Sequence, residues 1–105
     1  MRNSELPDSH ILKTVLEPLL DDFQYWFERS QNFLEKERLS FMSEQEQTDL
    51  RSRIQQAQAE LNSAKMLFQA TEGQVGIDMA TLAPWHKLVT EYWNVVRRFH
   101  SEQAT

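Results

Sequence analysis

Residues 43–68, SEQEQTDLRSRIQQAQAELNSAKMLF, decide the fold, because they combine a helix start signal with a long helical repeat. Ser43 followed by Glu46 is the pattern of a capping box, in which each side chain bonds a backbone donor of the first turn. The apolar residues then recur at alternating steps of four and three, which is helical spacing. We therefore expect a helix from about Glu44, with this buried stripe: Leu50, Ile54, Ala57, Leu61, Ala64 and Phe68.

A second helical stripe precedes this one. Its apolar positions also alternate at steps of four and three, and further apolar residues lie beside them, as expected for a helix that touches two neighbours. Pro18 interrupts the pattern, so we expect either a kink there or a short helix over 9–16 followed by a longer one over 17–37. The stripe comprises Leu12, Leu16, Leu19, Phe23, Trp26, Ser30 and Phe33, flanked by Ile11, Val15, Leu20, Phe27 and Leu34.

The third helix is expected after a loop. Both glycines of the chain, Gly73 and Gly76, lie in the stretch 73–83, which we interpret as a loop that packs on the end of the bundle. Pro84 suits the first turn of a helix, and apolar residues follow it at helical spacing as far as Phe99. The sequence thus predicts a single all-α domain over 1–105: a three-helix antiparallel bundle built on a long helical hairpin, with frayed tails at 1–8 and 101–105.

Composition excludes several classes of function. The 105 residues contain no Cys, which rules out disulfides, thiolate metal sites and cysteine nucleophiles. The net charge of −5 opposes the phosphate neutralisation that nucleic-acid binding requires. No apolar run reaches the length of about 20 residues that a membrane span needs, so we expect a cytoplasmic protein. Arg97 and Arg98, beside Trp93 and Phe99, leave a peripheral membrane contact open.

Enzymatic chemistry is not indicated. His86 and His100 are 14 residues apart, about 21 Å along one helix, so they cannot share a metal ion. The adjacent carboxylates Asp21 and Asp22 point apart on a helix and are typical of a solvated acidic face. Gly73 to Gly76 lacks the lysine and hydroxyl residue of a phosphate-binding loop. We expect no enzyme, and no catalytic, cofactor or metal residues.

The aromatic residues carry the main functional signal. Tyr25, Trp26 and Phe27 spread three rings over about 200° of one helix, so at least one of them should face solvent. Trp93 is similarly hard to bury beside Tyr92. Exposed rings on a rigid helix are typical anchors for a partner protein. The predicted contact residues are Asp21, Asp22, Tyr25, Trp26, Trp85 and Trp93, with the two aspartates as steering charges; Trp26 is open to a core role instead.

A resemblance adds to this interpretation. The segments LEPLLDDFQYWFER (16–29), ATEGQVGID (70–78) and PWHKLV (84–89) are similar to those of a small cyanobacterial protein family of unknown function, over about Leu12 to Phe99. The resemblance carries no catalytic or binding residues. It implies a cyanobacterial cytoplasm and, from the biology of that group, a connection to photosynthesis.

Two functions therefore remain in competition. The first is a non-catalytic protein-interaction module, an adaptor, assembly or regulatory factor, for which a homodimer is one expected arrangement. The alternative is a helical protein that binds a small ligand or pigment through the 73–86 loop, with Trp85 and His86 as the pocket walls.

Overall fold

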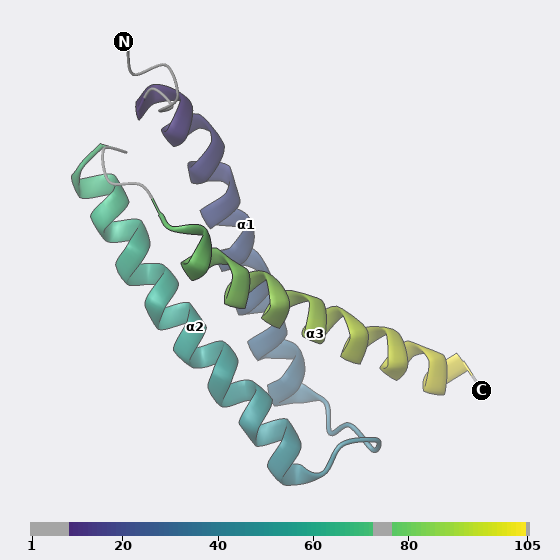
Figure 1. The fold of residues 1–105 in the computed structure, drawn as a ribbon. Helices are drawn as coiled ribbons and strands as arrows, with labels where there is room; N and C mark the ends of the chain where they lie inside the picture. Colours follow the sequence, from purple (N-terminus) through teal and green to yellow (C-terminus); the bar gives the residue numbers. More distant parts are fainter. Residues whose placement is uncertain (1–8, 73–76, 105) are drawn as a thin grey trace.

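The computed structural model describes residues 9–72 and 77–104, with side chains for 14–72, 77–78 and 80–103. It contains three helices in chain order: α1 (Ser9–Lys36), α2 (Glu44–Ala70) and α3 (Met79–Ala104). Figure 1 shows α1 and α2 side by side and antiparallel, while α3 crosses them. The predicted all-α bundle on a long helical hairpin is confirmed.

The core forms where α1 faces α2. The stripe of α2 is buried as predicted, with Ala64 partly buried at its edge. On α1 the fully buried residues step by four and three, as a helix with one face on its neighbour requires. These are Leu16, Leu20, Phe23, Phe27, Ser30 and Leu34.

A second flank of α1 faces α3. Leu19, Trp26 and Phe33 are only partly buried there, whereas Leu20 and Phe27 are among the most buried side chains. The sequence pattern placed Leu19, Trp26 and Phe33 in the central stripe and Leu20 and Phe27 beside it. The structure shows the opposite, with Leu20 and Phe27 in the centre of the core. The side chain of Leu12 lies outside the described residues. The expectation that this helix touches two neighbours is confirmed, because α2 and α3 cover different flanks.

Pro18 does not break α1, which runs as one helix from Ser9 to Lys36. The short separate helix over 9–16 is therefore wrong. Pro18 lies on the exposed side of the helix, while Leu16 and Leu20 on either side of it are buried in the core. Packing of these neighbours compensates for the backbone hydrogen bond that proline cannot donate.

The third helix begins earlier than predicted, at Met79 instead of Pro84. Asp78 explains the difference, because its carboxylate accepts a bond from the Ala80 amide at 3.2 Å and its carbonyl accepts from Thr81 at 2.9 Å. These bonds satisfy first-turn donors, as an N-cap residue does. Residues 79–83 are thus helical, and 73–76 of the expected loop lie outside the described residues.

The α1–α2 connection depends on one buried side chain, Gln47. Its Nε2 donates at 2.9 Å to the carbonyl of Leu34, in the last turn of α1, and at 2.7 Å to the carbonyl of Glu37, directly after the end of α1. Its Oε1 accepts from the Leu39 amide at 3.1 Å and the Arg38 guanidinium at 3.0 Å. All four hydrogen-bonding positions of the amide are used, so Gln47 ends α1 and shapes the turn.

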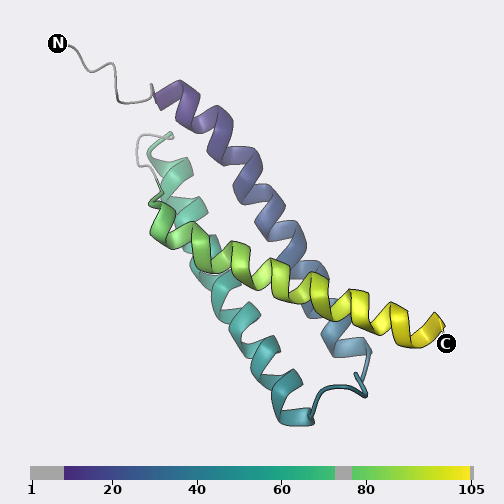
Figure 2. The same cartoon turned by 45° about the vertical axis from the view of Figure 1, so that its right-hand side comes forward.

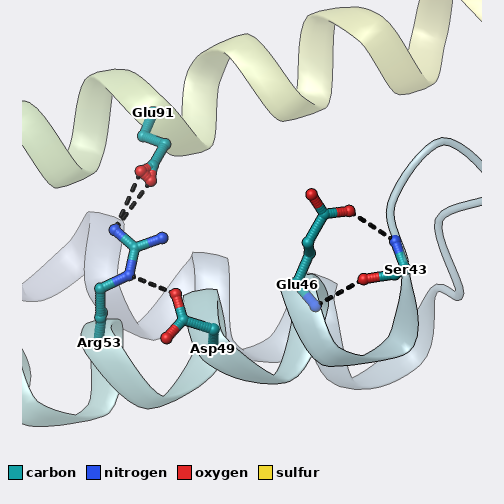
Figure 3. A network of polar contacts seen from close by, with 5 residues as sticks. All are labelled: Ser43, Glu46, Asp49, Arg53 and Glu91. Atoms are coloured by element: carbon teal, nitrogen blue, oxygen red, sulfur yellow. Dashed lines mark hydrogen bonds and ion pairs between the residues drawn. The ribbon is translucent and has the colours of Figure 1, made fainter.

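The start of α2 agrees with the prediction. Ser43 Oγ accepts from the Glu46 amide at 3.0 Å, and Glu46 Oε1 accepts from the Ser43 amide at 2.8 Å (Figure 3). This is the capping box, and it begins the helix at Glu44.

The molecule is elongated, since α3 lies across the hairpin and its end projects away from α2 in both ribbon views (Figures 1 and 2). The radius of gyration is 17.0 Å, against about 13 Å for a compact domain of this length. The far end of α3 contacts the α1–α2 connection, where Ser40 Oγ donates to Glu102 at 3.1 Å and Arg98 stacks on Phe41. Residues 101–104, expected to be frayed, continue α3.

Candidate functional site

Three aromatic rings meet on the surface where α3 crosses α1. The Trp26 ring makes edge contacts with Tyr25, at a centroid distance of 5.1 Å, and with Trp93 from α3, at 5.3 Å. Tyr25 is 53% exposed and Trp93 41% exposed, while Trp26 is partly buried between them. We call these three residues the aromatic face. Trp26 therefore joins the core to the surface.

The aromatic face continues inward as a series of rings between α1 and α3. Tyr92 lies 6.5 Å from Trp26 and 5.9 Å from Phe33, and Phe33 lies 5.2 Å from Phe99. Edge-to-face contacts of this kind add to the stabilisation that burial provides. The exposed rings therefore lie on a layer of packed rings.

Arg29 links the two tyrosines of the site. Its Nη1 donates to the Tyr25 hydroxyl at 3.3 Å, and its positive charge also acts on the Tyr92 hydroxyl. Burial raises the pKa of Tyr92 above its ordinary value of about 10, and the nearby positive charge of Arg29 only partly offsets this. The guanidinium thus holds Tyr25 in place beside Trp26.

A groove of about 400 Å³ opens beside the aromatic face. Its walls are mostly apolar, and the charged or ionisable side chains among the lining residues include Arg29 and His100 at the rim. The described lining comprises Trp26, Arg29, Phe33, Tyr92, Trp93, Val96 and His100. A partner side chain inserted here would contact rings on both helices.

The two predicted steering aspartates have different surroundings. Asp21 accepts an ion pair from Lys65 on α2 at 2.9 Å, so its charge is already compensated within the hairpin. Asp22 is exposed, and the side chains that the structure describes form no ion pair with it. Asp22 and Trp26 are four positions apart, which puts both on one side of α1. Of the two aspartates, Asp22 is therefore the one that offers an uncompensated charge beside the aromatic face.

Trp85 is not a surface anchor, and its assignment to the contact was wrong. It is 2% exposed, its ring packs edge-on against Phe23 at 5.7 Å, and its Nε1 donates to Glu60 at 3.5 Å. Trp85 shares one face of α3 with Leu88 and Tyr92, which are also buried, so helical spacing directs its ring into the core. The helical spacing of the apolar residues after Pro84 correctly predicts that Trp85 is buried, whereas its assignment to the contact surface does not.

Trp85 and His86 do not line one pocket. Trp85 borders a hollow of about 410 Å³ between α2 and α3, with Ala57 and Leu88 on its apolar floor. His86 is exposed and borders a different hollow of about 360 Å³, next to Leu19 and Phe23 of α1. Consecutive residues of a helix point about 100° apart, which explains the separation.

A polar bridge missed by the sequence interpretation joins α2 to α3. Figure 3 shows Glu91 of α3 directed at Arg53 of α2, with Arg53 Nη1 2.9 Å from Glu91 Oε1. Arg53 Nε also pairs with Asp49 at 2.9 Å. The hydrogen bond to Glu91 is the main cause that raises the pKa of Arg53 above its ordinary value. Arg53 and Glu91 lie 38 positions apart, so no local pattern could reveal the contact.

Two kinds of site are absent from the part of the chain that the structure describes. No three His, Asp or Glu side chains there come together as a metal site. None of the described helices combines the length and apolarity that crossing a bilayer requires.

Comparison with known proteins identifies a family. No curated protein and no solved structure matches the chain. A family model described as "Protein of unknown function (DUF2605)" matches residues 6–101, nearly the whole sequence. The chain therefore belongs to the DUF2605 family of proteins of unknown function.

Proposed function

We propose that the protein is a non-catalytic protein-interaction module that binds its partner through the aromatic face. The observation that supports this is the contact of two exposed rings, Tyr25 and Trp93, with one half-buried ring, Trp26, on two different helices. Trp, Tyr and Arg are the residues that most often dominate binding energy at interfaces. All three types meet here, since Arg29 bonds Tyr25.

The support beneath these rings favours tight binding. Ordering a side chain on association costs about 0.5–1.5 kcal/mol for each flexible group. Trp26 is held by rings on both sides, and Tyr25 is held by Trp26 and Arg29. Most of this ordering is therefore complete before the partner arrives.

The cellular part of the proposal rests on the resemblance of three sequence segments to a cyanobacterial family. We place the protein in a cyanobacterial cytoplasm, as an adaptor, assembly or regulatory factor with a connection to photosynthesis. The aromatic face is the part of the molecule that would carry this role.

Site-specific photo-cross-linking tests the proposal. Tyr25 is replaced by benzoylphenylalanine, and the protein is irradiated in an extract of its native cells. The expected result is a discrete cross-linked species. An excess of unlabelled wild-type protein should abolish this species, whereas an excess of an unlabelled Trp93→Ser variant should not. The matched control has the same probe at Met66, a 70% exposed apolar residue of α2. Equal products from both positions, or none from Tyr25, would contradict the proposal.

A second candidate function is binding of an apolar small molecule in the hollow beside Trp85. Its specific support is the volume of about 410 Å³ and the apolar floor formed by Ala57, Pro84 and Leu88. Protein purified gently from native cells would then carry a bound molecule, visible by absorption or mass spectrometry. A Tyr25→Ser, Trp93→Ser double variant should retain that molecule, because the hollow is separate from the aromatic face.

A further inference from the structure

We propose that the partner at the aromatic face is a second copy of this chain, with its α1 antiparallel to the first. This inference rests on the proposed function and names the occupant of that site. Asp22, Tyr25, Trp26 and Arg29 follow the spacing i, i+3, i+4, i+7, so they share one side of α1. That side has an apolar centre with opposite charges at its two ends.

This order of residues is self-complementary about a two-fold axis. If the axis passes between Tyr25 and Trp26, each residue of one copy faces its mirror position in the other. Tyr25 then meets Trp26 of the second copy, and Asp22 meets Arg29 of the second copy. Two-fold symmetry repeats each contact, so the dimer has one contact between Asp22 and Arg29 on each side of the central rings. An isologous interface needs a surface of this kind.

The next pair in the same register is also compatible. Pro18 faces Phe33 of the second copy, which brings an exposed apolar ring onto a half-buried aromatic one. Like charges do not face each other among these positions. The register therefore agrees with the chemistry over Pro18 to Phe33, which is about four turns of helix.

The charges that this arrangement needs are free within one chain. Two other acidic residues of the molecule do have internal partners: Asp21 pairs with Lys65 and Glu91 pairs with Arg53. Asp22 forms no ion pair with a side chain that the structure describes. Arg29 donates to the Tyr25 hydroxyl and forms no ion pair with a side chain that the structure describes, so its charge is uncompensated. A second copy supplies the missing opposite charge to both residues.

Charge reversal tests the proposal by sedimentation equilibrium across a range of protein concentrations. Wild-type protein should approach twice the 12.5 kDa mass of one chain. Asp22→Arg alone and Arg29→Asp alone each set like charges against each other twice, and should weaken the dimer at least about tenfold. In an equimolar mixture of the two variants, the mixed dimer has two attractive contacts in place of the two repulsive ones, so a dimer should be recovered. Glu28→Arg, on another side of α1, is the control with an equal charge change and should leave the dimer unchanged.

The outcomes separate this inference from the proposed function. A wild-type monomer at high concentration, together with a Tyr25 cross-link to a different protein, would overturn the dimer and leave the interaction module standing. A wild-type dimer whose two charge variants do not recover on mixing would overturn the register. A monomer that gives no cross-link from Tyr25 would overturn both proposals.

Discussion

Replacement of Gln47 by glutamate should destabilise the protein far more than its small change in shape suggests. Gln47 is 6% exposed, and its amide nitrogen donates to the carbonyls of Leu34 and Glu37. A carboxylate has no proton to donate to either one. It would also bring a negative charge to the end of α1, where the helix dipole is already negative.

The cost follows from these two lost donors. A buried acceptor left without a partner costs about 1–3 kcal/mol, so the loss of both should reach about 2–6 kcal/mol at pH 7. A domain of this size has about 5–15 kcal/mol of stability in total. The melting temperature should therefore fall by at least about 10 °C. Gln55→Glu, at an exposed position of the same helix, is the matched control and should change stability by less than about 0.5 kcal/mol.

The pH dependence provides a second check. Burial beside two carbonyls should raise the folded-state pKa of the carboxyl group introduced at position 47 above its unfolded value of about 4.3. Such a group destabilises the protein progressively as pH rises from its unfolded pKa to its folded pKa, so the deficit should be smaller at pH 4 than at pH 7. Urea unfolding of both variants and wild type at the two pH values measures this. A Gln47→Glu deficit equal to that of Gln55→Glu, or one independent of pH, would refute the reasoning.

Three further predictions concern the helix ends and the contacts of α3. Ser43→Ala removes the side-chain acceptor of the capping box and should lower stability by about 1 kcal/mol, measured by urea unfolding. Arg53→Met breaks the exposed bridge to Glu91 and should cost less than about 1 kcal/mol, with an effect that shrinks at high salt. The raised pKa of Tyr92 means that stability falls as pH rises above about 10, and alkaline unfolding of wild type against Tyr92→Phe should show a larger loss in wild type.

For some of the predicted contact residues, the neighbouring sequence was enough to predict exposure. For others, the surroundings depend on residues far away in the chain. Tyr25 and Trp93 are exposed as expected, because three consecutive rings, or two beside an already full stripe, cannot all face one core. Trp85 is buried because it shares one face of α3 with Leu88 and Tyr92, a helical spacing that the sequence shows but that the contact prediction did not follow. Asp21 pairs with Lys65, 44 positions away, and helical spacing rules cannot predict a contact between residues so far apart in the sequence.

Helices and their pairing were determined by the sequence itself. Steps of three and four residues define α1 and α2, and the Ser43 and Glu46 pair defines where α2 begins, because both features depend on groups within one or two turns. Only the tertiary structure decided how α3 crosses α1. That crossing brings Trp26 into contact with Trp93, far later in the chain, and creates the aromatic face. The direction in which α3 crosses α1 results from many contacts between distant residues, among them Arg53 with Glu91 and Phe33 with Phe99. Because these contacts act together, no short segment of the sequence is enough to predict that direction.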